Sequence, residues 1–273
     1  MQYVQQILFA IALGVAVYFF VNKVKSIRRN IFLGKDKEIN DNKSERWKTM
    51  ARVALGQSKM VVRPIAGILH IIVYVGFVLI NIEVLEILID GLFGTHRVLA
   101  FLGPVYNAAI GFFEILALLV LVACVFMLSR RFISKIPRFH KPEMKGWATK
   151  DATYILVMEI VLMAALLKMN ATDQLLQARE VEHYAIAGSF PISQYLTGFF
   201  EGFSTSTLII YERVFWWFHI IGILLFLNYV PYSKHLHIFL AFPNTWYSKL
   251  KSVGELPNMP EITNEVNMML DPS

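Results

Sequence analysis

Five long apolar runs constrain this chain more than any other feature of its sequence. Each is long enough to cross a bilayer as a helix, although the fourth is the shortest. A bilayer offers no water to unpaired backbone groups, so such runs must form helices. The sequence therefore predicts an all-α integral membrane protein, a bundle of five transmembrane helices. The expected helices cover approximately residues 4–21, 65–89, 99–128, 153–167 and 211–240.

The composition agrees with a membrane protein and excludes several kinds of site. The chain is 56% hydrophobic and 17% charged, whereas a soluble domain carries about 25% charged residues. Its one cysteine, Cys124, excludes a disulfide within the chain. It also excludes zinc sites and iron–sulfur clusters that this chain would hold alone. If the protein carries electrons, its own centres are not held by cysteines.

The distribution of basic residues predicts the orientation. Residues 23–63, 129–150 and 231–273 hold 22 of the 26 lysines and arginines. Cytoplasmic loops carry this excess, so we expect the N-terminus outside and the C-terminus in the cytoplasm. The expected location is the inner (cytoplasmic) membrane of a prokaryote, as a multi-pass protein. The net charge of +6 then reflects topology and contact with lipid or an acidic partner, and nucleic acid is not needed to explain it.

The fifth run carries two histidines at a spacing that suggests a cofactor. His219 and His237 are 18 residues apart, which is about five helical turns and about 27 Å, so both rings should share one face. Pro231 lies between them and should bend the helix. Two imidazoles on one face, one near each leaflet, suit two stacked haems. The alternative is that such histidines are interfacial or bonded to a neighbouring helix.

A third histidine, His70, lies about two turns into the second expected helix. That helix runs in the opposite direction, which brings His70 to the same depth as His237. The pair is therefore predicted to ligate one haem b iron. His235 competes with His237, but in a helix its offset of two residues turns it away.

His219 needs a separate partner near the outer leaflet. His96 lies in the outer turn after the second expected helix, and His183 lies in the long outer loop. Either one could complete a second haem site, so we expect one or two haems. The predicted iron ligands are His70, His237, His219 and His96.

The pattern H-x11-P-x5-H, formed by His219, Pro231 and His237, resembles the nitrate reductase gamma subunit family. It is also similar to the cytochrome b subunits of membrane heterodisulfide reductases. The resemblance covers about residues 1–245, and it includes His70. The family has a further histidine ten residues after His70, where this chain has Ile80. The resemblance implies that His70 and His237 hold the haem nearer the cytoplasm, and that the outer haem lacks its usual partner for His219.

The resemblance also implies a function. It predicts a respiratory-chain membrane cytochrome b, the electron-transfer part of an oxidoreductase. Electrons would pass between a quinone pool and a cytoplasmic iron–sulfur protein or a fused Cys-rich domain. Residues 1–245 would form the membrane domain, and residues 246–273 a polar, proline-containing tail or linker. The alternative is a haem-free membrane anchor or a small transporter subunit.

Carboxylates inside the expected helices are candidates for proton transfer. A carboxylate in a bilayer is costly, and quinol oxidation releases protons that one could accept. Glu83 and Glu86 lie on the face of the second helix opposite His70. The alternative is a protonated carboxyl, a hydrogen bond between helices or a partner for Arg97, which we favour for Glu159.

Overall fold

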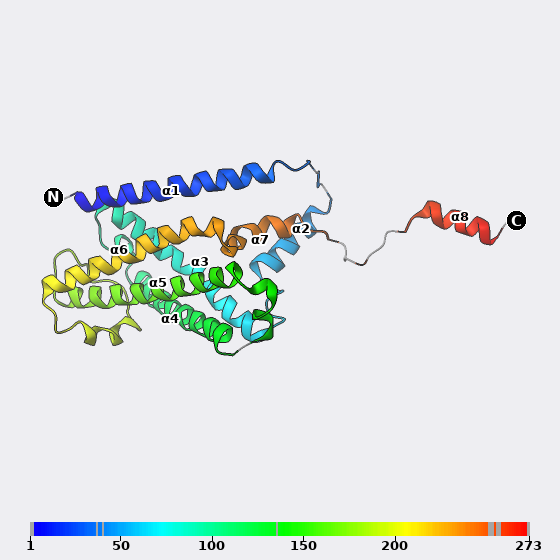
Figure 1. Cartoon of the computed structure of the whole chain (residues 1–273). Helices are drawn as coiled ribbons and strands as arrows, with labels where there is room; N and C mark the ends of the chain where they lie inside the picture. The colour runs from blue at the N-terminus through cyan, green and yellow to red at the C-terminus, as the bar shows by residue number, and fades with distance from the viewer. Residues whose placement is uncertain are drawn as a thin grey trace. The chain divides into compact units, whose positions relative to one another are not determined.

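The computed structural model describes residues 3–36, 38–39, 41–134, 136–250, 254 and 258–271, and its regular elements in these ranges are all helical (Figure 1). Five helices are long and apolar enough to cross a membrane. The predicted all-α fold with five such helices is confirmed, and the side on which the N-terminus lies stays a prediction. The five are α1 (Val4–Ile31), α3 (Pro64–Phe93), α4 (Pro104–Phe132), α5 (Trp147–Ala178) and α6 (Thr205–Tyr229).

The chain divides into two compact units, one made of Met1–Asp36 with Gln57–Ile238 and one of Lys37–Gly56 with Phe239–Ser273. The first unit holds the five long helices. In the second, Arg46 of α2 donates to the carbonyls of Trp246 and Ser248, at 3.0 and 2.9 Å. These hydrogen bonds join segments that are far apart in the chain, and the domain boundary expected at residue 245 stays a prediction. The second unit contains α2 (Lys43–Met50), most of α7 (His237–Trp246) and α8 (Pro260–Leu270), which lies in the expected tail.

The long helices of the first unit pack as a ring. Each of α3, α4 and α5 packs against the next long helix, while α1 packs against both α3 and α6 and closes the ring. Small residues let the helices approach closely. A Cβ atom on Gly76 would lie 2.3 Å from Val120, and one on Gly222 would lie 2.5 Å from Leu162. The fully buried Phe9 of α1 fills the ring, with its ring centroid 5.4 Å from that of Trp216.

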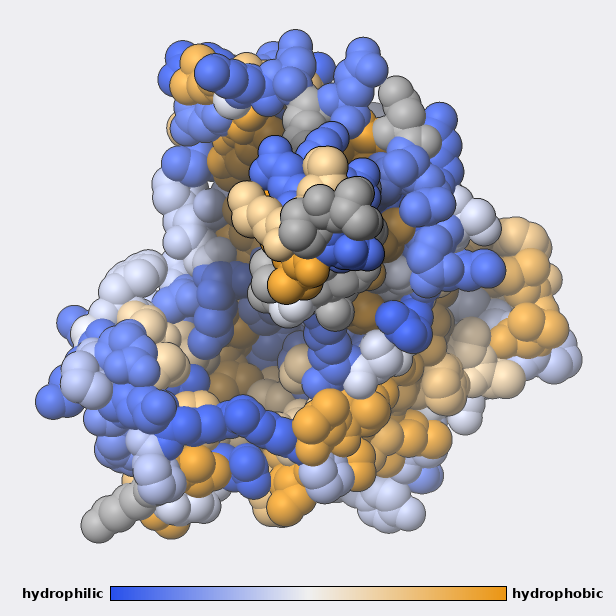
Figure 2. Space-filling model, turned by 90° about the vertical axis from the view of Figure 1, so that its right-hand side faces the viewer, coloured by the Kyte–Doolittle hydropathy of each residue, from blue (hydrophilic) through white to orange (hydrophobic). Residues whose placement is uncertain are grey.

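Large apolar side chains remain on the outer sides of these helices. Only 11% of the most apolar part of α1 is buried. Soluble monomers rarely expose apolar surface on this scale, so the surface is consistent with a multi-pass membrane protein. Figure 2 shows one end of the molecule, where hydrophilic residues cover much of the face and hydrophobic residues show along its lower and right-hand margins. Exposed examples are Ile11, Ile68, Phe126, Val157 and Leu225.

The structure breaks the expected helix 211–240. A turn of 3-10 helix follows α6 over Val230–Tyr232, and Ser233 is extended before α7 begins at His237. Asp151 of α5 holds both sides of the break, because it accepts from the Tyr229 hydroxyl at 2.6 Å and the Lys234 amide at 3.1 Å. The prediction that His219 and His237 share a face of one helix is therefore wrong.

Two other helix ends differ from the expected ones. The fourth expected helix, 153–167, is the longest in the structure, because Asn170, Asp173 and Gln177 continue α5 and are buried and bonded there. The third begins at Pro104 instead of residue 99, because Val98–Leu102 forms a 3-10 turn. Hydropathy marks the apolar part of a helix, and polar residues with partners extend it.

Candidate functional site

The rings of His70 and His237 face each other near the start of α3, with centroids 6.2 Å apart and planes tilted by 43°. Nδ1 of His237 lies 2.8 Å from the Lys234 carbonyl, which makes Nδ1 the donor and leaves Nε2 as an acceptor. Nδ1 of His70 is buried without a hydrogen-bond partner. A metal–imidazole bond is about 2 Å long and the ring centre lies about 1 Å further, so two axial imidazoles stand about 6 Å apart. The pair fits a haem iron, and ligation stays a prediction.

The competing histidine, His235, lies beside this pair. Its ring packs 5.3 Å from that of Phe226 and 5.8 Å from that of His237. Burial and, after it, the charges of His237 and Lys234 together lower the pKa of His235 to about 4. His237, and not His235, makes the ring contact with His70. The break after α6 brings His237 to this position.

His219 lies in the middle of the bundle and is 1% exposed. Its Nδ1 is 3.0 Å from the Leu162 carbonyl, so its Nε2 is also left as an acceptor. It lines a cavity of about 60 Å³ together with Ile80 and Glu159. Position 80 is where the resembled family has its second histidine, and the structure places that position beside His219. The second haem expected at His219 stays a prediction.

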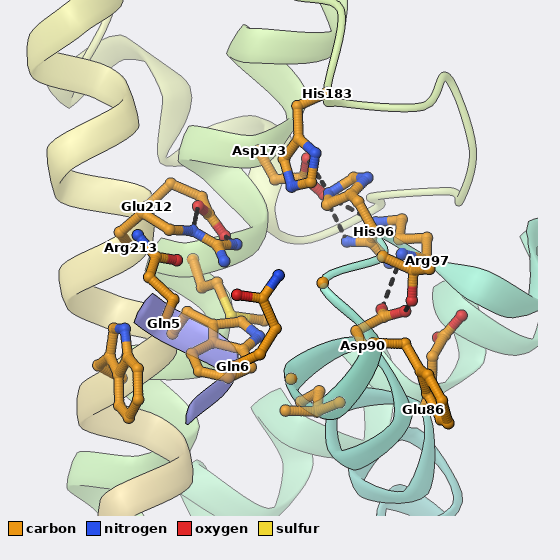
Figure 3. Close-up of a pocket in the computed structure, with 18 of the residues that line it drawn as sticks. Gln5, Gln6, Glu86, Asp90, His96, Arg97, Asp173, His183, Glu212 and Arg213 are labelled. Carbon is orange, nitrogen blue, oxygen red and sulfur yellow. Dashed lines mark hydrogen bonds and ion pairs between the residues drawn. The ribbon is translucent and has the colours of Figure 1, made fainter. Parts of the chain in front are cut away.

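A larger cavity, of about 480 Å³, lies near the end of α3, whereas the His70–His237 pair lies near its start. Figure 3 shows this cavity from close by. It is formed where α1 and α6 begin and where α3 and α5 end. We call it the outer cavity, after the side on which we expect it. Its apolar lining includes Ile87, Phe93, Met169, Trp216 and Trp217. Its polar lining includes Gln5, Gln6, Glu83, Glu86, Asp90, His96, Arg97, Asp173, His183, Glu212 and Arg213.

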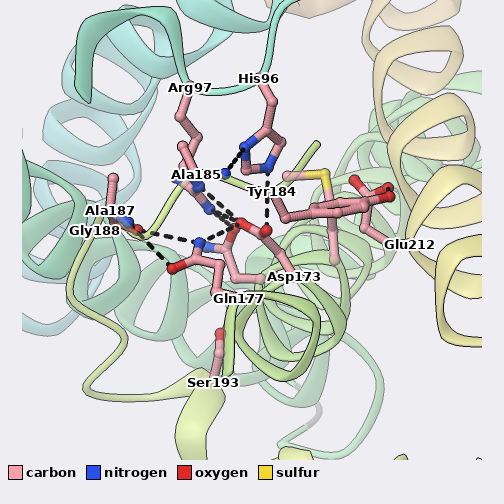
Figure 4. A network of polar contacts seen from close by, with 12 residues as sticks. His96, Arg97, Asp173, Gln177, Tyr184, Ala185, Ala187, Gly188, Ser193 and Glu212 are labelled. Carbon is pink, nitrogen blue, oxygen red and sulfur yellow. Dashed lines mark hydrogen bonds and ion pairs between the residues drawn. The ribbon is translucent and has the colours of Figure 1, made fainter. Parts of the chain in front are cut away.

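Arg97 is the centre of a buried polar network beside this cavity (Figure 4). Its guanidinium donates to Asp173 at 2.7 Å, to the Tyr106 hydroxyl at 3.2 Å and to Asn170 at 3.1 Å. Burial alone would lower the pKa of Arg97, but the Asp173 carboxylate raises it above its ordinary value, so the group stays charged. Asp90 at the end of α3 accepts from the Arg97 amide at 2.8 Å, which holds Arg97 in a left-handed conformation with φ of 51°. Such a strained position is characteristic of functional sites.

His96 belongs to the same network. Its Nδ1 accepts from the Ala185 amide at 3.2 Å, and its Nε2 contacts Asp173 at 3.0 Å. The ring of His183 lies 5.7 Å away. The structure therefore brings His96 to His183 and Asp173, whereas His219 lines a different cavity. The predicted ligation of a shared iron by His96 and His219 gains no support from these contacts.

Most carboxylates of the bundle are hydrogen-bonded by groups from other segments. Glu114 accepts from Asn170 at 3.0 Å and from the amides of Ile192 and Ser193 in the outer loop. Glu86 accepts from the Leu99 amide and the Tyr106 hydroxyl, both at 2.9 Å. These contacts agree with the alternative given for such carboxylates in the sequence analysis, in which they form hydrogen bonds between segments instead of transferring protons.

The sequence did not single out Asp173, Gln6 or Glu212 for the outer cavity. A signal existed for Asp173, because Asn170, Asp173 and Gln177 follow at helical spacing after the fourth apolar run. Glu212 accepts from the Tyr184 hydroxyl at 3.0 Å and pairs with Arg213 at 2.5 Å. Burial raises the pKa of Tyr184, and the charge of Glu212 raises it further.

The described part of the chain has the features of a membrane protein with five helices long enough to span a bilayer. Two histidines face each other near one end of this helix bundle, and a polar cavity lies near the other end. Two proteins are similar to this chain. It is 30% identical over 259 residues to the probable iron-sulfur-binding oxidoreductase FadF of Bacillus subtilis (strain 168), covering 95% of this chain and 35% of that protein. It is 24% identical over 217 residues to the EtfAB:quinone oxidoreductase of Syntrophomonas wolfei subsp. wolfei, covering 78% of this chain and 29% of that protein.

The chain thus spans about a third of the length of these curated relatives. No protein-family model matches it, and neither does any solved structure. The relatives are oxidoreductases by name, and neither is named as a nitrate reductase or heterodisulfide reductase subunit. The resemblance to those two families stays a prediction.

Proposed function

We propose that this chain is the membrane part of an oxidoreductase that passes electrons between a quinone pool and a cytoplasmic iron–sulfur protein or domain. In this proposal His70 and His237 hold haem b. The names of the relatives support the class, since one is iron-sulfur-binding and the other is a quinone oxidoreductase. The basic segments 23–63 and 129–150 support a cytoplasmic side facing an acidic partner, in the inner membrane of a prokaryote.

The observation that carries the proposal is the pair of facing imidazoles. A buried nitrogen without a partner, as at Nδ1 of His70, needs an explanation such as an ion or water. Nδ1 of His237 donates to the Lys234 carbonyl. A histidine that binds a metal usually donates its other ring N–H in this way, which fixes the orientation of the ring. Haem b would supply a one-electron carrier here, with a potential set by its axial ligands and burial.

The outer cavity supports the quinone half of the proposal. Its volume of about 480 Å³ is within the range of small-molecule sites, which combine apolar walls with a few polar groups. Trp216 and Trp217 offer flat apolar surfaces, and the Gln6 carboxamide points into the cavity (Figure 3). About 20 Å of helix α3 separates Glu83 in this cavity from His70.

The test is the haem content of the full-length protein purified in detergent. We expect the spectrum of a six-coordinate, low-spin b haem that can be extracted, because the sequence has no Cys-x-x-Cys-His. The variants His70→Ala and His237→Ala should each lose this haem. His235→Ala is the matched control and should keep it, since His235 packs against Phe226.

Two results would contradict the proposal. A colourless wild-type protein, expressed with ample haem, would exclude a cytochrome. Loss of haem in His235→Ala with retention in His237→Ala would show that the ligand has been assigned to the wrong histidine.

A further inference from the structure

One carboxylate of the outer cavity differs from the other four in its contacts. Glu83 takes part in no hydrogen bond or ion pair within the described part of the chain, although it is only 5% exposed. A carboxylate inside a membrane bundle is costly, so its place in a cavity wall without a protein partner calls for a function. The other four all have partners: Glu86 binds Tyr106 and the Leu99 amide, Asp90 the Arg97 amide, Asp173 the Arg97 guanidinium and Glu212 the Tyr184 hydroxyl.

The position of Glu83 suits proton transfer into and out of the cavity. It lies on α3, and Glu86 and Asp90 follow it at intervals of about one turn on the same helix, toward the end that we expect outside. Asp90 is only partly buried. The three carboxylates therefore lead from the cavity wall toward solvent.

We propose that the outer cavity binds a quinol headgroup and that Glu83 is the residue that accepts its protons. The proposal rests on the proposed function, which supplies the haem as electron acceptor. Oxidation of a quinol to a quinone breaks two O–H bonds and releases two protons and two electrons. The proposed haem would take up the electrons one at a time. Each proton goes to a carboxylate oxygen of Glu83, which releases the first toward Glu86 and solvent before it takes the second.

Other charged groups around the cavity set the field at Glu83. The positive groups are held by their own carboxylates, Arg97 by Asp173 and Arg213 by Glu212. This leaves Glu83 free to gain and lose a proton without breaking an ion pair. The titratable and charged groups nearby are Glu86 and Asp90 on α3, His96 and Arg97 after it, Tyr106 and Glu114 on α4, Asp173 on α5, His183 in the outer loop, Glu212 and Arg213 on α6, and Tyr3 before α1.

The experiment compares Glu83→Gln, Glu83→Asp and a control, Glu159→Gln, in the full-length protein. Glu159 is a similarly buried carboxylate that does not line the outer cavity. The probe is menadiol, a quinol headgroup without a tail. Stopped-flow absorbance follows haem reduction from pH 5 to 9, and quenching of tryptophan fluorescence by menadione follows binding, since Trp216 and Trp217 line the cavity.

We expect the wild-type rate to rise with pH as the acceptor deprotonates. In Glu83→Gln, haem reduction by menadiol should be at least about 100-fold slower, the usual contribution of a general base, and its rate should no longer depend on pH. Its menadione binding should match the wild type. Glu83→Asp should recover part of the rate, and Glu159→Gln should behave as the wild type.

The outcomes separate this inference from the proposed function. A Glu83→Gln variant with the rate and pH profile of the wild type would overturn the role of Glu83 and leave the proposed function standing. Loss of menadione binding in both Glu83 variants would show a structural role and would also overturn it. A wild-type protein that has no haem, or that menadiol does not reduce, would overturn the proposed function and this inference together.

Discussion

At the scale of single residues, the histidines differ in what their ring nitrogens contact. His219 and His237 each place Nδ1 against a backbone carbonyl, which leaves Nε2 with a lone pair for a metal or substrate. His96 instead accepts an amide N–H at Nδ1, so its Nε2 carries the proton next to Asp173. The same side chain is thus a candidate ligand in one setting and part of a polar network in another.

The network around Arg97 gives a prediction about stability. Asp173→Asn removes the carboxylate that neutralises the buried guanidinium, which should destabilise the protein by about 3 kcal/mol. Unfolding by denaturant in detergent, followed by tryptophan fluorescence, measures this. The control is Glu180→Gln on the exposed start of the outer loop, where we expect a change within about 0.5 kcal/mol. Equal effects of the two substitutions would show that the Arg97–Asp173 pair does not stabilise the fold.

At the scale of elements, the break between α6 and α7 decides where His237 lies. In a continuous helix, His237 would have lain on the same face as His219, as the spacing of 18 residues predicts. Instead Pro231 and the extended Ser233 interrupt it, and Asp151 binds a group on each side of the interruption. The ring of His237 reaches His70 because α5 holds this connection in place.

Asp151 should therefore act on the proposed haem through this connection. Asp151→Ala should weaken haem binding by about tenfold or more, the usual effect of losing a group that orients a ligand. Titration of the haem-free protein with haem, followed by absorbance, measures the affinity. Thr153→Ala is a matched control two residues further along α5, because its hydroxyl bonds only within the helix, to Thr149. Affinities that are the same in both variants would show that Asp151 does not position His237.

At the scale of the whole molecule, the long helices separate two sites. The histidine pair lies at the start of α3, and the outer cavity lies at its end. The distribution of basic residues predicts that the end of α3 with the histidine pair faces the cytoplasm. An electron carrier near the cytoplasm and a quinone site near the outside would suit transfer across the membrane, and this requires the predicted orientation.

Cysteine labelling tests that orientation. Cys124 is fully buried, so the wild-type chain should react little with a membrane-impermeant maleimide. In intact cells, Glu201→Cys in the outer loop should be labelled, because that residue is exposed on the side predicted to be outside. Lys145→Cys, exposed between α4 and α5, should be labelled only after the membrane is opened. The reverse pattern would place the N-terminus in the cytoplasm.

The sequence alone determined the number and type of the long helices, because each apolar run is a local property of consecutive residues. It also brought His70 and His237 to the same depth, since depth follows from the distance of each residue from the end of its run. Only the tertiary structure decided the contacts between distant segments. Arg97 meets Asp173 across 76 residues, and that contact extends α5 beyond its apolar part. Likewise, Glu83 and Glu86 look alike in the sequence, and only the approach of Tyr106 and Leu99 to Glu86 leaves Glu83 without a partner. Helical spacing is encoded locally, whereas the partner of a buried polar group comes from wherever the fold brings the chain together.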